Sequence, residues 1–161
     1  MSTQSDLLKD IFKICLKKKI FITTMESCTG GLVSSAITDV PGSSRVFDKG
    51  FITYSNESKI ALLGVSEHTL KTYGAVSKEV ISEMATKPIS NFLTKNSISI
   101  ATSGVAGPEQ SEQKPVGLIW LASFYNETLL VKKLNLGKLD RSMIRKKTVI
   151  AALNLLKKNL T

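Results

Sequence analysis

The sequence predicts an α/β fold, a single three-layer α/β/α domain in which helices cover both sides of a mixed sheet. Short runs rich in β-branched and aromatic residues alternate with segments whose apolar residues recur at helical spacing. Two of the strand-like runs lead into glycine-containing turns, and the last two lie next to each other as a pair. A chain of 161 residues with 42% hydrophobic residues can bury a substantial core as one domain spanning residues 1–161.

The individual elements follow from apolar spacing and from capping residues. Expected strands cover residues 20–25, 47–54, 98–102, 116–124 and 128–136, and expected helices cover 7–15, about 30–38, 60–63, a segment from 78, and 141–160. Gly64 is expected to close one helix and Ser77 to cap the next. Pro88 is expected to kink or divide that helix, because proline removes an intrahelical hydrogen bond. Residues 48–50 are turn-like and predict a hairpin or bulge.

Composition excludes several classes of protein. No apolar run reaches the roughly 20 residues that cross a bilayer, and the polar N-terminus is unlike a signal peptide, so we expect a cytoplasmic protein. The two cysteines and one histidine provide no disulfide framework and no zinc site, so we expect no metal and no cofactor. The net charge of +9 comes from scattered lysines with few aromatics between them, which favours a solvated basic surface over nucleic-acid binding.

The stretch from residue 26 to residue 59 carries most of the polar chemistry. An apolar strand leads into Ser27, Thr29, Gly30 and Gly31, and a helix is expected to begin at the glycines. Free N–H groups and the helix dipole make such a turn a natural anion site, to which the two hydroxyl groups add. The alternative is that these small residues only cap a helix and form turns.

Several ordered motifs resemble one known family. They read ESCTGG, TDVPGSS, GFITYSNESK, HTLKTYGAVS, SGVAGPEQSEQKPVG and DRSMIRKKT. Together they resemble the C-terminal domain of the CinA (competence/damage-inducible) family from about Leu7 to the end of the chain. The resemblance implies a nicotinamide mononucleotide deamidase of NAD recycling, which hydrolyses the carboxamide to nicotinic acid mononucleotide and ammonia. It also implies the stand-alone form, without the additional N-terminal domain of some members, and a homo-oligomer such as a dimer.

One motif departs from the family pattern. The family's glycine-rich loop usually reads TGIAGPGG or similar, with glycine after the proline. Here Glu109 follows Pro108. We expect this change to affect the shape of the loop and the fit of the substrate.

Amide hydrolysis needs a nucleophile, a proton shuttle and stabilisation of the oxyanion. With no metal cluster and a single histidine, His68, that is more consistent with an exposed residue than a functional one, the sequence points to a serine activated by a lysine. The resemblance implies Ser44 as nucleophile, Lys59 as general base and Tyr54 as proton relay or orienting group. Ser27 is the rival nucleophile because it lies at the sharper turn, and Cys28 is a further alternative, although no base for it is evident. The alternative without catalysis is that Ser44 is only a turn residue and Lys59 a solvated lysine on a helix surface.

The substrate-binding residues are expected on three segments. The predicted set is Ser27, Thr29, Gly30, Gly31, Ser103, Gly104, Gly107 and Arg145. Arg145 lies in the DRSMIRKKT motif, and a guanidinium group binds phosphate through two parallel hydrogen bonds. The alternative is a surface arginine on an amphipathic helix.

A second function from another class stays open at this point. The competence name of the family and the basic charge fit a non-catalytic nucleotide- or nucleic-acid-binding accessory protein. Release of ammonia from nicotinamide mononucleotide distinguishes the two hypotheses, as does the salt dependence of DNA binding.

Overall fold

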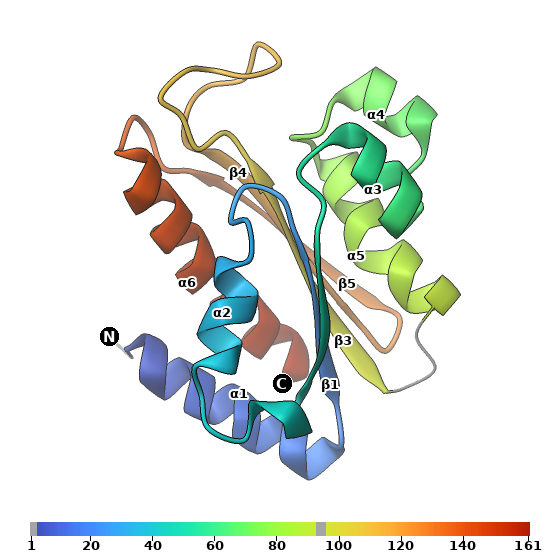
Figure 1. Cartoon of the computed structure of the whole chain (residues 1–161), viewed down its shortest axis with the longest axis vertical. Helices are drawn as coiled ribbons and strands as arrows, with labels where there is room; N and C mark the ends of the chain where they lie inside the picture. Colours follow the sequence, from blue (N-terminus) through green and yellow to red (C-terminus); the bar gives the residue numbers. More distant parts are fainter. Residues whose placement is uncertain (1–2, 93–95) are drawn as a thin grey trace.

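The protein is described by a computed structural model over residues 3–92 and 96–161, and the predicted α/β/α architecture is confirmed (Figure 1). A five-stranded sheet has the order β2-β1-β3-β4-β5. The strands are β1 (Phe21–Glu26), β2 (Phe47–Ile52), β3 (Ser97–Gly104), β4 (Leu118–Tyr125) and β5 (Thr128–Asn135). β1 pairs in parallel with β2 and β3, whereas β3, β4 and β5 pair antiparallel, so the sheet is mixed.

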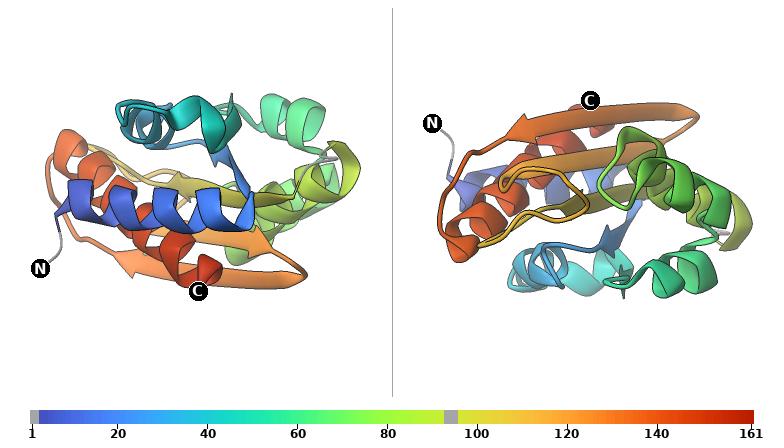
Figure 2. Two further views of the ribbon diagram at one scale, coloured as in Figure 1. Left: turned by 90° about the horizontal axis from the view of Figure 1, so that it is seen from below. Right: turned by 90° about the horizontal axis from the view of Figure 1, so that it is seen from above.

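Helices cover both faces of the sheet, as the side views also show (Figure 2). They are α1 (Gln4–Lys18), α2 (Leu32–Thr38), the 3₁₀ turn η1 (Ser43–Arg45), α3 (Asn56–Leu63), α4 (Glu67–Tyr73), α5 (Lys78–Phe92) and α6 (Arg141–Leu160). α1, α2 and α6 form one outer layer, while α5 packs on the opposite face and carries α3 and α4. In the described ranges 3–92 and 96–161, no helix is both long and apolar enough to span a membrane.

The sheet separates two hydrophobic clusters. The larger one joins the inner faces of α1, α2 and α6 to apolar side chains such as Ile22, Ile98 and Ile119. The smaller one joins α3, α4 and α5 to Met25 and Ala101 on the other face of the same strands. Alternate side chains of β1 therefore enter different cores, as the two-residue period of a strand requires.

The local signals in the sequence are mostly confirmed. Gly64 ends α3 in the left-handed conformation, and the Ser77 hydroxyl accepts a hydrogen bond from the backbone N–H of Val80 at the start of α5. The turn-like triplet at residues 48–50 corresponds to a register shift in β2 and not to a hairpin. Pro88 does not divide its helix: α5 continues through it, with one backbone N–H fewer to bond, and the kink stays a prediction.

The parallel strands determine where the functional groups gather. β1, β2 and β3 run in the same direction, so the residues that follow them meet at one edge of the sheet, at the top of Figure 1. In open α/β sheets this carboxyl edge is where ligands bind.

Candidate functional site

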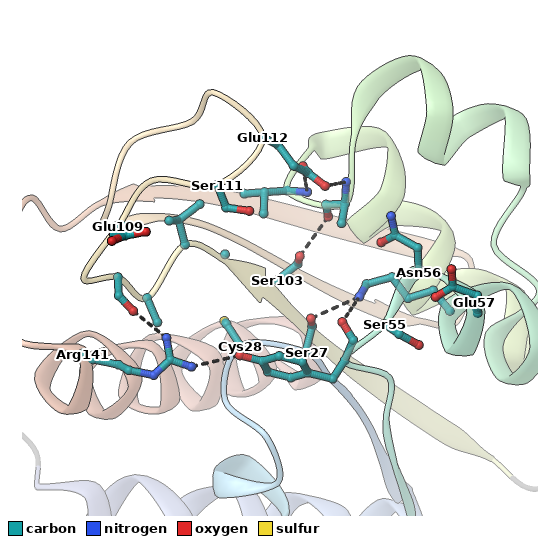
Figure 3. Close-up of a pocket in the computed structure, with 18 residues that line it drawn as sticks. Ser27, Cys28, Ser55, Asn56, Glu57, Ser103, Glu109, Ser111, Glu112 and Arg141 are labelled. Atoms are coloured by element: carbon teal, nitrogen blue, oxygen red, sulfur yellow. Dashed lines mark hydrogen bonds between the residues drawn. The ribbon is translucent and has the colours of Figure 1, made fainter.

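A pocket of about 430 Å³ opens at the carboxyl edge of the three parallel strands (Figure 3). This volume lies in the range of pockets that hold small molecules, ~300–1,000 Å³. Its walls come from the turn after β1, the start of α3, the 75–76 segment before α5, the loop after β3 and the first residue of α6. The lining includes Ser27, Cys28, Tyr54, Ser55, Asn56, Glu57, Lys59, Ser103, Gly104, Gly107, Glu109, Glu112 and Arg141.

Lys59 is the buried cation of this pocket. It lies on the first turn of α3, and its side chain is only 1% exposed. Its Nζ donates hydrogen bonds to the carbonyl oxygens of Thr53 (2.8 Å) and Tyr54 (3.2 Å) and lies 3.2 Å from the Oγ of Ser27. A buried charge is costly unless it is hydrogen-bonded, and these three oxygen atoms supply its contacts.

The surroundings of Lys59 favour the neutral amine more than water does. Burial lowers the pKa of Lys59 from its ordinary value, because a poorly solvated site penalises the charged form. The carboxylates of Glu112 and Glu57 act in the opposite direction and only partly offset the effect of burial. The side chain is therefore closer to a working general base than a solvated lysine.

The predicted contact between Ser44 and Lys59 is wrong within one copy of the chain. Ser44 is exposed in the 3₁₀ turn before β2, whereas Lys59 follows the other end of that strand. Six strand residues separate the two ends, or roughly 20 Å at about 3.3 Å per residue. Figure 1 shows η1 at the bottom of the molecule and α3 at the top. The serine that meets Lys59 is Ser27, the rival named from the sequence.

The predicted anion site at Gly30 and Gly31 is filled by the protein itself. Glu26, the last residue of β1, is fully buried, and its carboxylate accepts hydrogen bonds from the backbone N–H groups of Gly31, Val33 and Ser34. The hydroxyl of Thr29 also donates to this carboxylate. None of Thr29, Gly30 and Gly31 lines the pocket, and substrate binding by them stays a prediction.

Arg145 also differs from the prediction. Its Nε and one terminal nitrogen donate to the carbonyl oxygens of Cys28 (3.1 Å) and Thr29 (2.9 Å), and it does not line the pocket. Arg141, one helical turn earlier on α6, lines the pocket instead and donates to the Gly107 carbonyl and the Tyr54 hydroxyl. Sequence reasoning missed Arg141, although its place at the start of the last helix could have indicated it.

Tyr54 reaches the pocket with two different groups. Its hydroxyl accepts a hydrogen bond from Arg141 at 2.9 Å, while its backbone carbonyl accepts one from Lys59 at 3.2 Å. The ring is 61% exposed. Tyr54 thus joins the two cations of the site, and a proton-relay role for its hydroxyl stays a prediction.

The other predicted binding residues line the pocket. Ser103 and Gly104 end β3, and Gly107 follows in the adjoining loop. The hydroxyl of Ser103 already donates to the carbonyl of Ala75 (2.8 Å), and the carbonyl of Gly107 already accepts from Arg141 (2.6 Å). These residues therefore shape the wall as well as contributing polar atoms to it.

Residues 4–160 match the family model described as the CinA C-terminal domain. The chain belongs to the CinA C-terminal domain family. Two relatives carry the name competence-damage inducible protein: one from Thermoanaerobacter pseudethanolicus is 42% identical over 98% of this chain, and one from Clostridium botulinum is 45% identical over 99%. This chain spans 38% of the length of each of them.

Solved CinA structures have the same architecture. A competence/damage inducible protein from Agrobacterium tumefaciens is 37% identical, with a TM-score of 0.90 and 99% coverage of both chains. A competence damage-inducible protein from Klebsiella pneumoniae is 29% identical, with a TM-score of 0.92, covering 99% of this chain and 98% of the other. The homo-oligomer implied by the family resemblance stays a prediction.

The surroundings of Cys28 in this CinA domain disfavour it as a nucleophile. It is 5% exposed, and burial raises the pKa of its thiol to about 12. Since the thiolate is the reactive form, the side chain remains an inert thiol at neutral pH.

The glycine-rich loop of this CinA domain is fastened across the pocket by two side chains. Both carboxylate oxygens of Glu112 accept backbone N–H groups, from Ala75 (3.0 Å) and Val76 (3.3 Å). Lys114 donates in the other direction, to the carbonyl oxygens of Tyr73 (2.7 Å) and Val76 (2.6 Å). We call this pair of side chains the Glu112–Lys114 clasp. It closes one wall of the pocket and keeps a carboxylate near Lys59.

Proposed function

We propose that the protein is a nicotinamide-nucleotide amidohydrolase that converts nicotinamide mononucleotide and water into nicotinic acid mononucleotide and ammonia. The observation that carries the proposal is the buried Lys59 amine 3.2 Å from the Ser27 hydroxyl in a pocket of small-molecule size. A serine next to a desolvated lysine is a recognised arrangement for acyl transfer without histidine. Membership of the CinA family and the motif resemblance support the choice of substrate.

The contacts of Lys59 aim its lone pair at Ser27. A neutral amine keeps two N–H groups, and the carbonyl oxygens of Thr53 and Tyr54 can accept both. The lone pair then faces the remaining neighbour, the Ser27 hydroxyl. The serine O–H donates to Nζ in this state, which is the orientation that a general base requires.

The reaction follows from this pair in two balanced halves. Lys59 takes the proton of Ser27 while Oγ bonds to the carboxamide carbon, and the resulting ammonium gives the proton to the amide nitrogen as the C–N bond breaks. Ammonia leaves, and an ester to Ser27 remains. Water then attacks the ester carbon and transfers a proton through Lys59 back to the serine oxygen, which releases the carboxylic acid and restores both side chains.

The charges of the pocket fit a substrate with a cationic ring and an anionic tail. Arg141 is the guanidinium group at the pocket, and we assign it to the phosphate in place of Arg145. The carboxylates of Glu57, Glu109 and Glu112 also line the pocket, and they complement the positive charge of the pyridinium ring. The same carboxylates repel a polyanion, which argues against nucleic acid as the ligand of this pocket.

A coupled ammonia assay with purified protein and nicotinamide mononucleotide tests the proposal. We expect turnover in the intact chain and none in Ser27→Ala. Absence of ammonia release by a folded wild-type protein at any pH between 6 and 10 would contradict it. A salt-dependent affinity for duplex DNA under the same conditions would instead favour the accessory-protein hypothesis.

A further inference from the structure

Ser27 lies on the turn between β1 and α2, which backbone hydrogen bonds fasten to β3 at Ser27 and to α2 at Gly31. Residues 27–31 connect β1 to α2, and four backbone hydrogen bonds involve them: Ser27 N–H to Thr102, Gly30 N–H to Ser27, Leu32 N–H to Thr29 and Ser35 N–H to Gly31. Gly30 and Gly31 both have positive φ angles, of 57° and 101°. Glycine restricts the backbone less than other residues do, so side-chain contacts add to what fixes this turn.

A buried carboxylate holds the turn from the α2 side. Glu26 accepts hydrogen bonds from three backbone N–H groups and from the hydroxyl groups of Thr29 and Ser34, at 2.5–3.0 Å. The Thr29 hydroxyl also contacts the hydroxyl of Thr102 at 2.8 Å, which ties the turn to β3. A fully buried carboxylate with five donors is well satisfied, yet the proposed reaction does not use it.

A guanidinium group holds the same turn from the side of α6. Arg145 donates to the carbonyl oxygens of Cys28 and Thr29, two consecutive residues directly after the nucleophile. A Cβ built on Gly30 would lie 3.3 Å from the guanidinium, so the turn and the arginine are packed tightly together. Glu26 thus accepts hydrogen bonds from the turn, and Arg145 donates hydrogen bonds to it. Thr29 contacts both, through its hydroxyl and its carbonyl group.

We infer that Glu26 and Arg145 are positioning residues that fix the turn 27–31 and thereby keep the Ser27 hydroxyl within reach of Lys59. The inference rests on the proposed function, because it gives these two charges a role in that reaction. Neither residue lines the pocket, so each acts through the turn. A misplacement of about 1 Å of a reacting group can cost about a hundredfold in rate, which makes the fixing of this turn consequential for catalysis.

Arg145→Lys is the first test, because lysine keeps the charge but cannot donate to both carbonyl groups in the planar geometry of guanidinium. We expect kcat for nicotinamide mononucleotide to fall about tenfold to a hundredfold, with an unchanged KM and an unchanged pH profile. Lys147→Ala, at an exposed basic residue of the same helix, is the matched control and should keep the wild-type kcat.

A second readout does not depend on the substrate. The rate at which an aryl sulfonyl fluoride labels Ser27, followed by mass spectrometry, should fall with kcat in Arg145→Lys. A purely structural role would lower only the midpoint of thermal unfolding, and then the folded variant would react at the wild-type rate. Labelling and kcat both within twofold of wild type, in Arg145→Lys protein with native circular dichroism, would overturn the inference.

Glu26→Gln is the second variant. If Glu26→Gln fails to fold, Arg145→Lys still tests the inference. A glutamine amide would place donors opposite backbone N–H groups, so we expect slower labelling and a lower kcat in any folded fraction. A folded Glu26→Gln protein with wild-type kcat would count against Glu26. Wild-type protein that is labelled at Ser27 yet releases no ammonia would overturn the choice of substrate alone. Wild-type protein that is not labelled at Ser27 would overturn both proposals.

Discussion

The Ser27 Oγ and the Lys59 Nζ lie 3.2 Å apart, although 32 positions separate the two residues in the chain. Each follows the carboxyl end of a different parallel strand, Ser27 after β1 and Lys59 after β2. Their contact is thus a product of the sheet topology. A substitution at either residue should therefore slow the same proposed step, the attack of Ser27 with transfer of its proton to Lys59.

Ser27→Ala and Ser44→Ala distinguish the nucleophile implied by geometry from the one implied by the family resemblance. Loss of Ser27 should lower kcat at least about a thousandfold with little change in substrate binding, because the covalent step disappears. Ser44→Ala should stay within about twofold of wild type, since Ser44 is exposed at the other end of β2. Steady-state ammonia release and calorimetric binding measure the two effects. The reverse pattern would move the nucleophile to Ser44, supplied from another copy of the chain.

Lys59→Arg tests the general base. A guanidinium group does not lose its proton near neutrality, so this variant should be nearly inactive while it keeps a positive charge. In the wild type, activity should rise with pH along a single limb, because Lys59 must lose its proton before it can accept one from Ser27. Burial lowers the pKa of Lys59, so the limb should lie below the ordinary value of about 10.4. Near-normal turnover in Lys59→Arg would exclude lysine as the base.

The elements of the fold could be predicted from local signals, but the site required knowledge of which strand ends meet. Apolar spacing indicated α6, and the glycine after Leu63 indicated the end of α3. The family resemblance paired Ser44 with Lys59, but the strand β2 between them places them at opposite ends. The role of Glu26 was hidden because its partners are backbone N–H groups, which no side-chain motif reveals. Arg141 and Arg145 differ by one helical turn, and only the packing of α6 decides which of them reaches the pocket.

Arg141→Met should weaken recognition of the phosphate group. Loss of a charge-assisted hydrogen bond costs about 1.5–3 kcal/mol, so KM for nicotinamide mononucleotide should rise about tenfold to a hundredfold. Nicotinamide riboside lacks the phosphate, and its kcat/KM should change much less. Parallel kinetics with the two substrates provide the measurement. An equal loss of kcat/KM with both substrates would mean that Arg141 orients Tyr54 and does not bind the phosphate.

Gly74→Ala should open the Glu112–Lys114 clasp. A Cβ at Gly74 would lie 2.5 Å from Oε2 of Glu112 and 2.9 Å from Nζ of Lys114, so both side chains would have to move. Gly137→Ala is the matched control, because Gly137 also has a positive φ (72°, against 78°) but has open space around its Cβ position. Both variants should lose stability through backbone strain, about 1–3 kcal/mol, and Gly74→Ala should lose more, because its φ of 78° and ψ of 165° lie in a region that is nearly restricted to glycine. Only Gly74→Ala should also raise KM, because the pocket wall loosens. Equal KM values for folded Gly74→Ala and Gly137→Ala would show that the Glu112–Lys114 clasp does not shape the pocket.

Lys59→Met should change how stability depends on pH. Below its lowered pKa, Lys59 is protonated in the folded and unfolded states alike, so the wild type bears the full cost of a buried charge. Above that pKa the folded state releases a proton that the unfolded state keeps up to about pH 10.4, so the unfolded state binds more protons and stability rises with pH. Methionine has a similar length and no charge, and it removes this dependence. The free energy of unfolding of the wild type, measured in urea relative to Lys59→Met, should therefore increase as pH rises through this window. A relative decrease would mean that folding raises the pKa of Lys59, and a lysine held as a cation could not serve as the base for Ser27.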